Sequence, residues 1–149
     1  MPYWLVKSEP DAWSWKMQQD KGDVGESWTG VRNYQALNNM KKMQIGDKGF
    51  FYHSNKGREI VGIFEVISGL YPDPTAERDT RWECVTIRAV CDMPFPVSLI
   101  AIKANSLLAK MDLVVFSRLS VQSVMWDEYK EVCRMGKLYS PPLSKFGEN

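Results

Sequence analysis

Residues Tyr3–Pro10 read YWLVKSEP: four aromatic or aliphatic residues, then four that are polar or interrupt regular structure. Aromatic and branched residues favour a strand, and Pro10 ends it because proline has no N–H for the hydrogen-bond ladder. A buried strand that runs into Lys7, Ser8 and Glu9 has two interpretations. It leads into a surface loop, or its end supplies the polar floor of a binding pocket.

The rest of the chain alternates short strands with short helices. Ser14, Asn33 and Ser98 precede apolar periodic segments and are expected to cap helices. Strands are expected at residues 48–54, 59–68 and 81–93, and helices at 14–21, 34–43, 99–104 and 125–134. In the helix that follows Asn33, we expect the side chains of Leu37 and Met40, and that of Ile45 just beyond, to face inward.

This element order predicts an α+β fold that is mainly β, with strands curling into a small barrel. The pairs of prolines at 72–74 and 94–96 are expected to break the chain into loops. The 149 residues suit one domain, which we assign to residues 1–139. The tail, residues 140–149, has two prolines and few hydrophobic residues and is expected to be mobile.

Composition excludes several classes of protein. No apolar run approaches the roughly 18 residues of a membrane span, and the start lacks the pattern of a secretory signal. The sequence therefore predicts a cytoplasmic protein that does not bind membranes. The 3 cysteines form no CxxC pair and are expected to be reduced, and with a single histidine no metal site or cofactor is expected.

Charge is distributed unevenly along the chain. The net charge is only +1, which argues against a general polyanion binder. However, Asp47 is the only acid from residue 27 to 58, and Asp112 is the only acid from 93 to 126. If these two stretches share a face, that face is positive; otherwise the clustering is incidental.

Catalytic motifs are missing from the sequence. A Ser-His-Asp arrangement would need His53, and no GxSxG elbow accompanies it. Neither a GxxxxGK[ST] loop nor a GxGxxG motif is present. We therefore do not expect an enzyme, although an RNA- or nucleotide-modifying activity that uses Glu9 stays open, as does a peptide-binding domain.

Polar and aromatic residues gather in four short segments where a core does not require them, residues 7–10, 28–33, 52–55 and 117–121. A tryptophan such as Trp28 can stack on a planar ligand, and Gly30 allows close backbone approach. Ser, Asn and Glu side chains can read the edge of a base, while Arg and Lys bind phosphates. Each residue alone also fits a purely structural role.

Several motifs together resemble the EVE domain family of the PUA-like superfamily, and the match runs from about residue 2 to 129. They are YWLVKSEP, WTGVRNYQA, GDKGFFYHSN, IVGIFEV, YPDPTA and SRLSVQSV. The resemblance implies a PUA-like pseudo-barrel, a mixed curled sheet with short helices around it. It also implies kinship with YTH domains, which read N6-methyladenine in RNA.

The resemblance further implies a non-catalytic module that flips a modified cytosine or adenine of DNA or RNA into an aromatic pocket. In that pocket Trp28 matches the cage tryptophan, and Tyr52 and Trp82 are candidates for further cage residues. The complete set implied for base binding is Lys7, Ser8, Glu9, Trp28, Gly30, Val31, Arg32, Asn33, Tyr52, His53, Ser54, Ser117 and Arg118.

Overall fold

The computed structural model describes residues 3–78 and 80–144. The strands are β1 (Tyr3–Ser8), β2 (Glu26–Ser27), β3 (Lys48–His53), β4 (Glu59–Val66), β5 (Tyr71–Pro72), β6 (Glu83–Cys84), β7 (Thr86–Ser98) and β8 (Val121–Val124). The helices are α1 (Trp15–Asp20), α2 (Tyr34–Lys41), α3 (Leu99–Ala104), α4 (Asp112–Val115) and α5 (Trp126–Met135), with 3-10 turns η1 (Gly22–Val24) and η2 (Ser106–Leu108).

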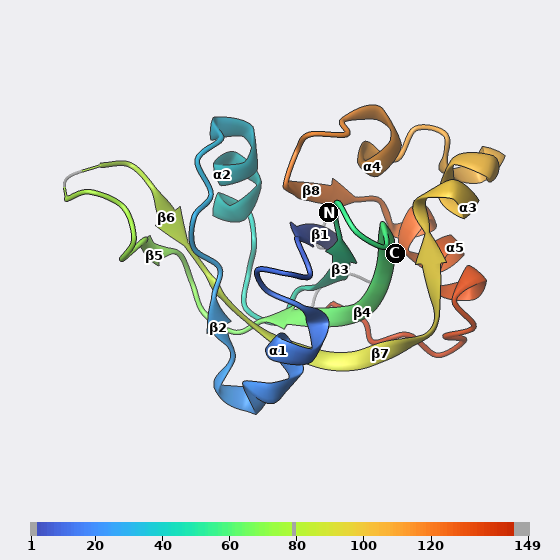
Figure 1. The fold of residues 1–149 in the computed structure, drawn as a ribbon, viewed down its shortest axis with the longest axis horizontal. Coiled ribbons are helices and arrows are strands. Elements are labelled where there is room, and N and C mark those ends of the chain that lie inside the picture. Colours follow the sequence, from blue (N-terminus) through green and yellow to red (C-terminus); the bar gives the residue numbers. More distant parts are fainter. Residues whose placement is uncertain (1–2, 79, 145–149) are drawn as a thin grey trace.

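Six strands form one mixed sheet in the order β2-β7-β4-β3-β1-β8, and β5 pairs with β6 in a separate arm. Strands β1 and β3 run parallel, and the other neighbours in this sheet are antiparallel. Figure 1 shows that the sheet curls, with helices packed around it and the β5–β6 arm projecting to one side. The predicted α+β fold, mainly β and barrel-like, is confirmed.

Strand β1 lies inside the sheet, and its alternating side chains enter two different hydrophobic clusters. Tyr3 and Leu5 pack toward α3, α4 and α5 in what we call the α5-side cluster, with Phe50, Tyr52 and Tyr129 among its members. Trp4 and Val6 pack toward α1 and α2 in the α2-side cluster, with Trp15, Trp28, Leu37 and Phe51 among its members. Both faces of the sheet are therefore buried, which explains the nearly continuous apolar run of YWLV.

The helix caps agree with the sequence. Ser14, Asn33 and Ser98 each accept a hydrogen bond from the backbone N–H three residues ahead. Leu37 and Met40 are buried as expected, but the expectation for Ile45 is wrong because its side chain is 57% exposed. Ile45 lies in a turn beyond α2, where Asp47 N donates to Gln44 O, so the helical period no longer applies.

Strand β7 continues through Pro94 and Pro96 to Ser98, so the predicted break at these prolines is wrong. The pairing of β4 with β7 jumps from Gly62↔Asp92 to Ile60↔Val97. Residues 93–96 fall in this irregularity, where β4 makes no ladder pair with them. A strand tolerates proline at such a position because no ladder N–H is required.

The end of the described chain contacts the main body. Tyr129 Oη donates to Pro142 O at 2.5 Å, and Lys48 N donates to Ser144 Oγ at 2.8 Å. Of the tail for which mobility was expected, residues 145–149 lie outside the described residues. Within the described part, no helix is long and apolar enough to cross a membrane. All 3 cysteines are free thiols.

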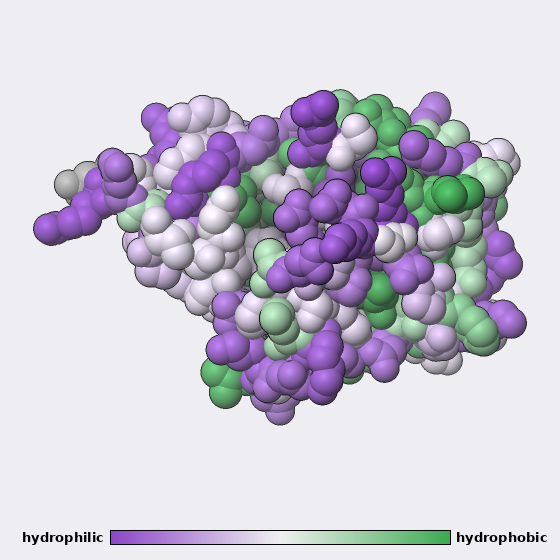
Figure 2. Space-filling model, in the orientation of Figure 1, coloured by the Kyte–Doolittle hydropathy of each residue, from purple (hydrophilic) through white to green (hydrophobic). Residues whose placement is uncertain are grey.

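The surface near the β3–β4 turn differs in character from the surface over α3 and α4. In Figure 2, hydrophilic side chains cover the turn between β3 and β4, whereas hydrophobic patches lie over α3 and α4. The exposed apolar residues of that second region are Ile100, Leu107, Val115 and Phe116.

Candidate functional site

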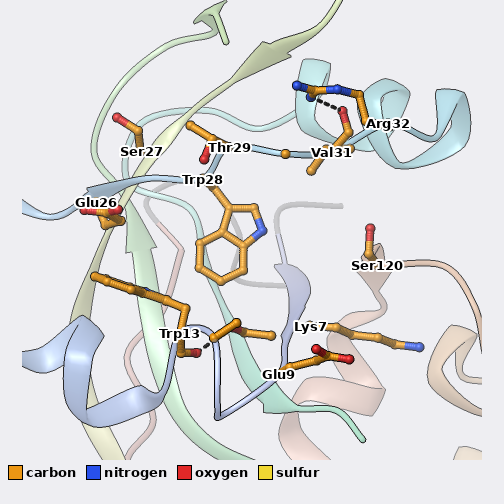
Figure 3. A pocket seen from close by; sticks show the side chains of 13 residues that line it. Lys7, Glu9, Trp13, Glu26, Ser27, Trp28, Thr29, Val31, Arg32 and Ser120 are labelled. Atoms are coloured by element: carbon orange, nitrogen blue, oxygen red, sulfur yellow. Dashed lines mark hydrogen bonds between the residues drawn. The ribbon is translucent and has the colours of Figure 1, made fainter. Parts of the chain in front are cut away.

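A pocket of about 380 Å³ opens at the carboxyl end of β1 (Figure 3). We call it the indole pocket because two tryptophans, Trp13 and Trp28, line it. Its complete lining is Lys7, Ser8, Glu9, Ala12, Trp13, Glu26, Ser27, Trp28, Thr29, Gly30, Val31, Arg32 and Ser120. The polar strand end therefore does form part of a hollow, as one of the two interpretations of YWLVKSEP required.

The turn after β1 positions Trp13. Ser8 Oγ donates to Trp13 O at 2.5 Å, and Trp13 N donates to Glu9 O at 2.9 Å. At the far edge of the ring, Trp13 Nε1 donates to Gln18 Oε1 at 2.9 Å, and the fully buried Gln18 donates in turn to Ile87 O. The indole is thus fixed at both ends, so it is a rigid wall of the pocket.

Trp28 follows β2, whose pairing with β7 fixes the backbone, and Trp28 N donates to Val85 O at 2.8 Å. Its ring packs edge-on against Phe51, with centroids 5.6 Å apart, and is 9% exposed. Trp28 Nε1 has no hydrogen-bond partner among the described residues. The unpaired buried side-chain atoms of that part are Asp47 Oδ1 and Gln122 Oε1, so Trp28 Nε1 reaches solvent.

Figure 3 shows how the two indoles are arranged in the pocket. Trp28 presents its face to the viewer and extends into the middle of the hollow, while Trp13 is seen edge-on below it. The two rings therefore form a corner rather than a parallel pair. A flat ligand can stack on one ring while its edge meets the other.

The loop after Trp28 is held by a buried carboxylate from the β5–β6 arm. Gly30 has φ +86°, a conformation that favours glycine, and its N–H donates to Asp73 Oδ2 at 2.8 Å. Arg32 Nη1 donates to the same oxygen at 3.1 Å, and Thr75 N–H and Oγ1 bond the other oxygen. Burial raises the pKa of Asp73, but the bonds from Thr75, Gly30 and Arg32 outweigh it and lower the pKa to about 2. Asp73 is therefore ionised and clamps the loop.

Lys7 marks the rim of the pocket. Its Nζ donates to Ser117 O at 2.6 Å, and burial lowers its pKa. Glu26 pairs with Lys21 at 3.4 Å, whereas the exposed carboxylate of Glu9 has no hydrogen-bond partner within the described ranges. The indole pocket therefore offers one carboxylate acceptor and one indole donor that no protein group occupies.

The predicted site residues lie in three neighbouring hollows, apart from His53. The structure brings Lys7, Ser8, Glu9, Trp28, Gly30, Val31 and Arg32 together in the indole pocket. It places Tyr52, Ser54 and Ser117 in a neighbouring hollow that shares Lys7, and Asn33 and Arg118 in a third hollow with Phe116. Asn33 also caps α2, where its side chain accepts from Ala36 N.

His53 lies outside the indole pocket, beneath α1. Its Nε2 accepts a hydrogen bond from Trp15 N at 3.0 Å. Burial lowers the pKa of His53, and the opposing effect of the Glu59 charge is smaller. The imidazole is therefore in its neutral acceptor form at neutral pH. Here the histidine orders the helix start, and it does not face the ligand space.

Trp82, considered as a further cage residue, stacks on Tyr34 with centroids 5.0 Å apart and does not line the pocket. The second aromatic wall is Trp13, which the predicted set did not include. That set also left out Ala12, Glu26 and Ser27, and it left out Thr29 and Ser120 although both lie in the segments 28–33 and 117–121. The only local signal for Trp13 was its position three residues after Pro10, which ends the polar segment. Within the described ranges, no group of three His, Cys, Asp or Glu residues could hold a metal ion.

Comparison with known proteins relates this chain to domains of the same architecture. The model of the EVE domain family matches residues 2–135. A crystal structure of a protein from Agrobacterium tumefaciens is 65% identical, has a TM-score of 0.94 and covers 95% of this chain and 97% of that chain. The predicted membership of this family is confirmed.

Two further structures contain nucleic acid. Human THYN1 protein, in complex with DNA containing 5-methylcytosine, is 28% identical with a TM-score of 0.84, covering 91% of this chain and 97% of that chain. The YTH domain of Zygosaccharomyces rouxii MRB1, in complex with N6-methyladenosine RNA, is 18% identical with a TM-score of 0.53, covering 91% and 86%. The latter similarity concerns the fold, and it confirms the predicted structural kinship with YTH domains.

Proposed function

The chain belongs to the EVE domain family, and on that premise we propose that it is a non-catalytic module that reads a modified base in DNA or RNA. The base, a modified cytosine or adenine, leaves its stack and enters the indole pocket. The observation that carries this proposal is the Trp28 ring, which extends into a hollow of about 380 Å³ with its N–H unpaired among the described residues. The complex of human THYN1 protein with 5-methylcytosine-containing DNA supports it.

Stacking supplies the main attraction in this account. An aromatic ring under a base contributes roughly 1–3 kcal/mol, and the Trp13 edge limits where the base can lie. Unpairing a base costs a few kcal/mol, so single strands are the easier targets. Binding at the pocket is therefore expected to favour single-stranded over duplex DNA or RNA.

Hydrogen bonds supply the selectivity. The Glu9 carboxylate can accept from an exocyclic amino group of the base, whereas Trp28 Nε1, whose N–H lies in the plane of its ring, can donate to a group of the strand beside the stacked base. A buried methyl group adds about 0.8 kcal/mol, which is a few-fold in affinity. Recognition of a modification thus combines a modest apolar gain with the positions of these two polar groups.

Two groups that a serine-type mechanism would use, Ser8 and His53, are committed to structural bonds. Ser8 Oγ donates to Trp13 O, and the His53 imidazole accepts from the Trp15 amide. Neither can then form a nucleophile and base pair with the other, which supports a binding role.

The three free thiols support a cytoplasmic location, where thiols stay reduced.

Titration of short labelled single strands at one fixed salt concentration tests the proposal. The strands share one sequence and carry a central cytosine, 5-methylcytosine, 5-hydroxymethylcytosine, adenine or N6-methyladenine. We expect at least one modified strand to bind several-fold more tightly than its plain counterpart, and Trp28→Ala to remove the difference. Equal affinities across the panel for the unaltered protein would refute the proposal.

A further inference from the structure

A second hollow lies beside the indole pocket, and Lys7 lines both. It has a volume of about 320 Å³ and connects the turn after β3 with α3 and the loop after α4. Its lining is Lys7, Tyr52, Ser54, Asn55, Arg58, Leu99, Lys103, Leu113 and Ser117. We call it the basic hollow.

The charges of the basic hollow all have one sign. Lys7, Arg58 and Lys103 come from three separate elements, and the lining contains no carboxylate. None of the three forms an ion pair with a carboxylate in the part of the chain that the structure describes. Three cations without a paired carboxylate around one concave space make the electrostatic potential there positive. This potential favours the binding of an anion.

Hydrogen bonds fix the turn that carries Arg58. Arg58 Nε donates to Asn55 O at 3.4 Å across the turn, and Leu99 N donates to Arg58 O at 2.9 Å, tying that turn to the start of α3. On the other side, Ser54 N donates to Ser8 O at 2.9 Å. The turn that carries Arg58 is thus joined both to the strand end of the indole pocket and to the helix that carries Lys103.

The hollow also contains neutral donors suited to an oxyanion. Tyr52 buries its ring in the α5-side cluster while the residue lines the hollow, and Ser54 and Asn55 add a hydroxyl and an amide. Neither the Tyr52 hydroxyl nor the Ser54 hydroxyl has a hydrogen-bond partner among the described residues, and neither is an unpaired buried atom. Both are therefore accessible to a ligand in the hollow.

We propose that the basic hollow binds a backbone phosphate of the nucleic-acid strand whose base occupies the indole pocket. This inference rests on the proposed function for the identity of the strand. Lys7 lines both spaces, so the phosphates that flank an inserted base lie next to the basic hollow in this arrangement. Lysine and arginine side chains are the usual partners of backbone phosphates, and they fix register without reading sequence.

A double variant tests the hollow, Arg58→Gln with Lys103→Gln. Both residues are exposed, so the fold should tolerate the changes. The matched control is Lys42→Gln with Lys110→Gln, two exposed lysines that line neither space and also lose two charges. Each protein is titrated with a strand carrying the preferred base and with the same strand made abasic at that position.

We expect the Arg58/Lys103 variant to bind both strands about tenfold more weakly than the unaltered protein at moderate salt. The slope of log K against log salt should become shallower by about 0.7 for each lost contact with a single strand. The Lys42/Lys110 control should change affinity about twofold or less. Trp28→Ala should weaken only the base-bearing strand.

The outcomes separate the two proposals. If the Arg58/Lys103 variant keeps the affinity and the salt slope of the unaltered protein, or changes them no more than the control does, the phosphate site is overturned. That result leaves the base preference measured on the same strands untouched. If the unaltered protein shows no base preference while the abasic strand still loses affinity in the variant, base reading fails and the phosphate site stands.

Discussion

Two tryptophans pack against the same phenylalanine and differ in their hydrogen bonding. Trp15 and Trp28 both belong to the α2-side cluster and both contact Phe51, at centroid distances of 5.0 Å and 5.6 Å. Trp15 Nε1 donates to Asp92 Oδ1 at 2.7 Å, whereas Trp28 Nε1 has no partner within the described ranges. Burial alone, 6% against 9% exposed, hardly separates them.

Local packing explains why the environments differ. Gly62 lies under the Trp15 ring, and a Cβ there would come within 2.1 Å of Trp15 Cζ2. The missing side chain at Gly62 therefore gives the Trp15 indole the space that it fills. Around Trp28, the loop bonded to Asp73 lines the indole pocket, into which the ring extends. Of these two, Trp15 with its bonded N–H is the structural indole, and Trp28 with its accessible, unpaired N–H beside a hollow is the candidate for binding.

Trp15→Ala should have the largest effect in the molecule. It removes a large buried ring and leaves Asp92 without its indole donor, so we expect a loss of about 3–5 kcal/mol in the free energy of unfolding. Chemical denaturation followed by circular dichroism measures this loss. Trp15→Phe is the milder companion and should lose less. A Trp15→Ala protein as stable as the original would contradict the structural assignment.

Trp28→Ala should show the reverse pattern. We expect an affinity loss of about 5- to 150-fold for the preferred strand, from roughly 1–3 kcal/mol of stacking, with a smaller loss of stability than Trp15→Ala. Fluorescence anisotropy and thermal melting of the same sample provide both numbers. Trp28→Phe, which keeps a flat ring but no N–H, should recover stability and part of the affinity. Unchanged binding by the alanine variant would remove Trp28 from the site.

Asp73→Asn tests whether the clamp keeps the Trp28 side open. It weakens acceptors for Gly30 and Arg32, and we expect about 1–3 kcal/mol of lost stability, with weaker strand binding because the loop shifts. The pKa of Asp73 is lowered to about 2 from 3.8, so its stabilisation is complete above 3.8 and lost as pH falls through 2. Acid unfolding should therefore be shallower in the variant below pH 4. Identical acid curves would contradict the clamp.

His53 provides the smallest and most selective test, since it acts on the Trp15 side. Its pKa is lowered below 6.5, so the neutral acceptor for Trp15 N stabilises the fold above that pH and is lost as pH falls through the lower folded value. Between pH 7.5 and 5 we expect a loss of at most about 1 kcal/mol, seen as a small drop in Tm. His53→Gln should flatten that part of the profile. An equal drop in the variant would assign the pH dependence elsewhere.

Local chemistry made much of the fold predictable. The caps at Ser14, Asn33 and Ser98 are single-residue signals whose partners lie three residues away, so no tertiary information was needed. Pro94 and Pro96 misled because their tolerance depends on a pairing irregularity with β4, which is set by contacts distant in sequence. Ile45 misled because a helical period was continued beyond the end of α2.

The candidate site was predictable only where it follows one strand end or one loop. Lys7, Ser8 and Glu9, and Trp28 with its glycine loop, meet because β1 and β2 end at the same hollow. Strand β3 runs parallel to β1, and Tyr52 is paired with Lys7. Tyr52 and Ser54, which follows β3, therefore line the adjacent hollow, to which Lys7 also belongs. Trp13 was missed because its placement depends on Gln18 and the Ile87 carbonyl, a contact across 69 residues.

The indole N–H signals of the protein test the central claim most directly. The chain has 6 tryptophans, and each gives one signal in a ¹⁵N–¹H spectrum, assigned by single Trp→Phe substitutions. On titration with the preferred modified strand, we expect the Trp28 signal to shift the most, with Trp13 also affected and Trp15 unchanged. If the strand binds while the Trp28 signal stays in place, the base does not lie on that ring and the account is wrong.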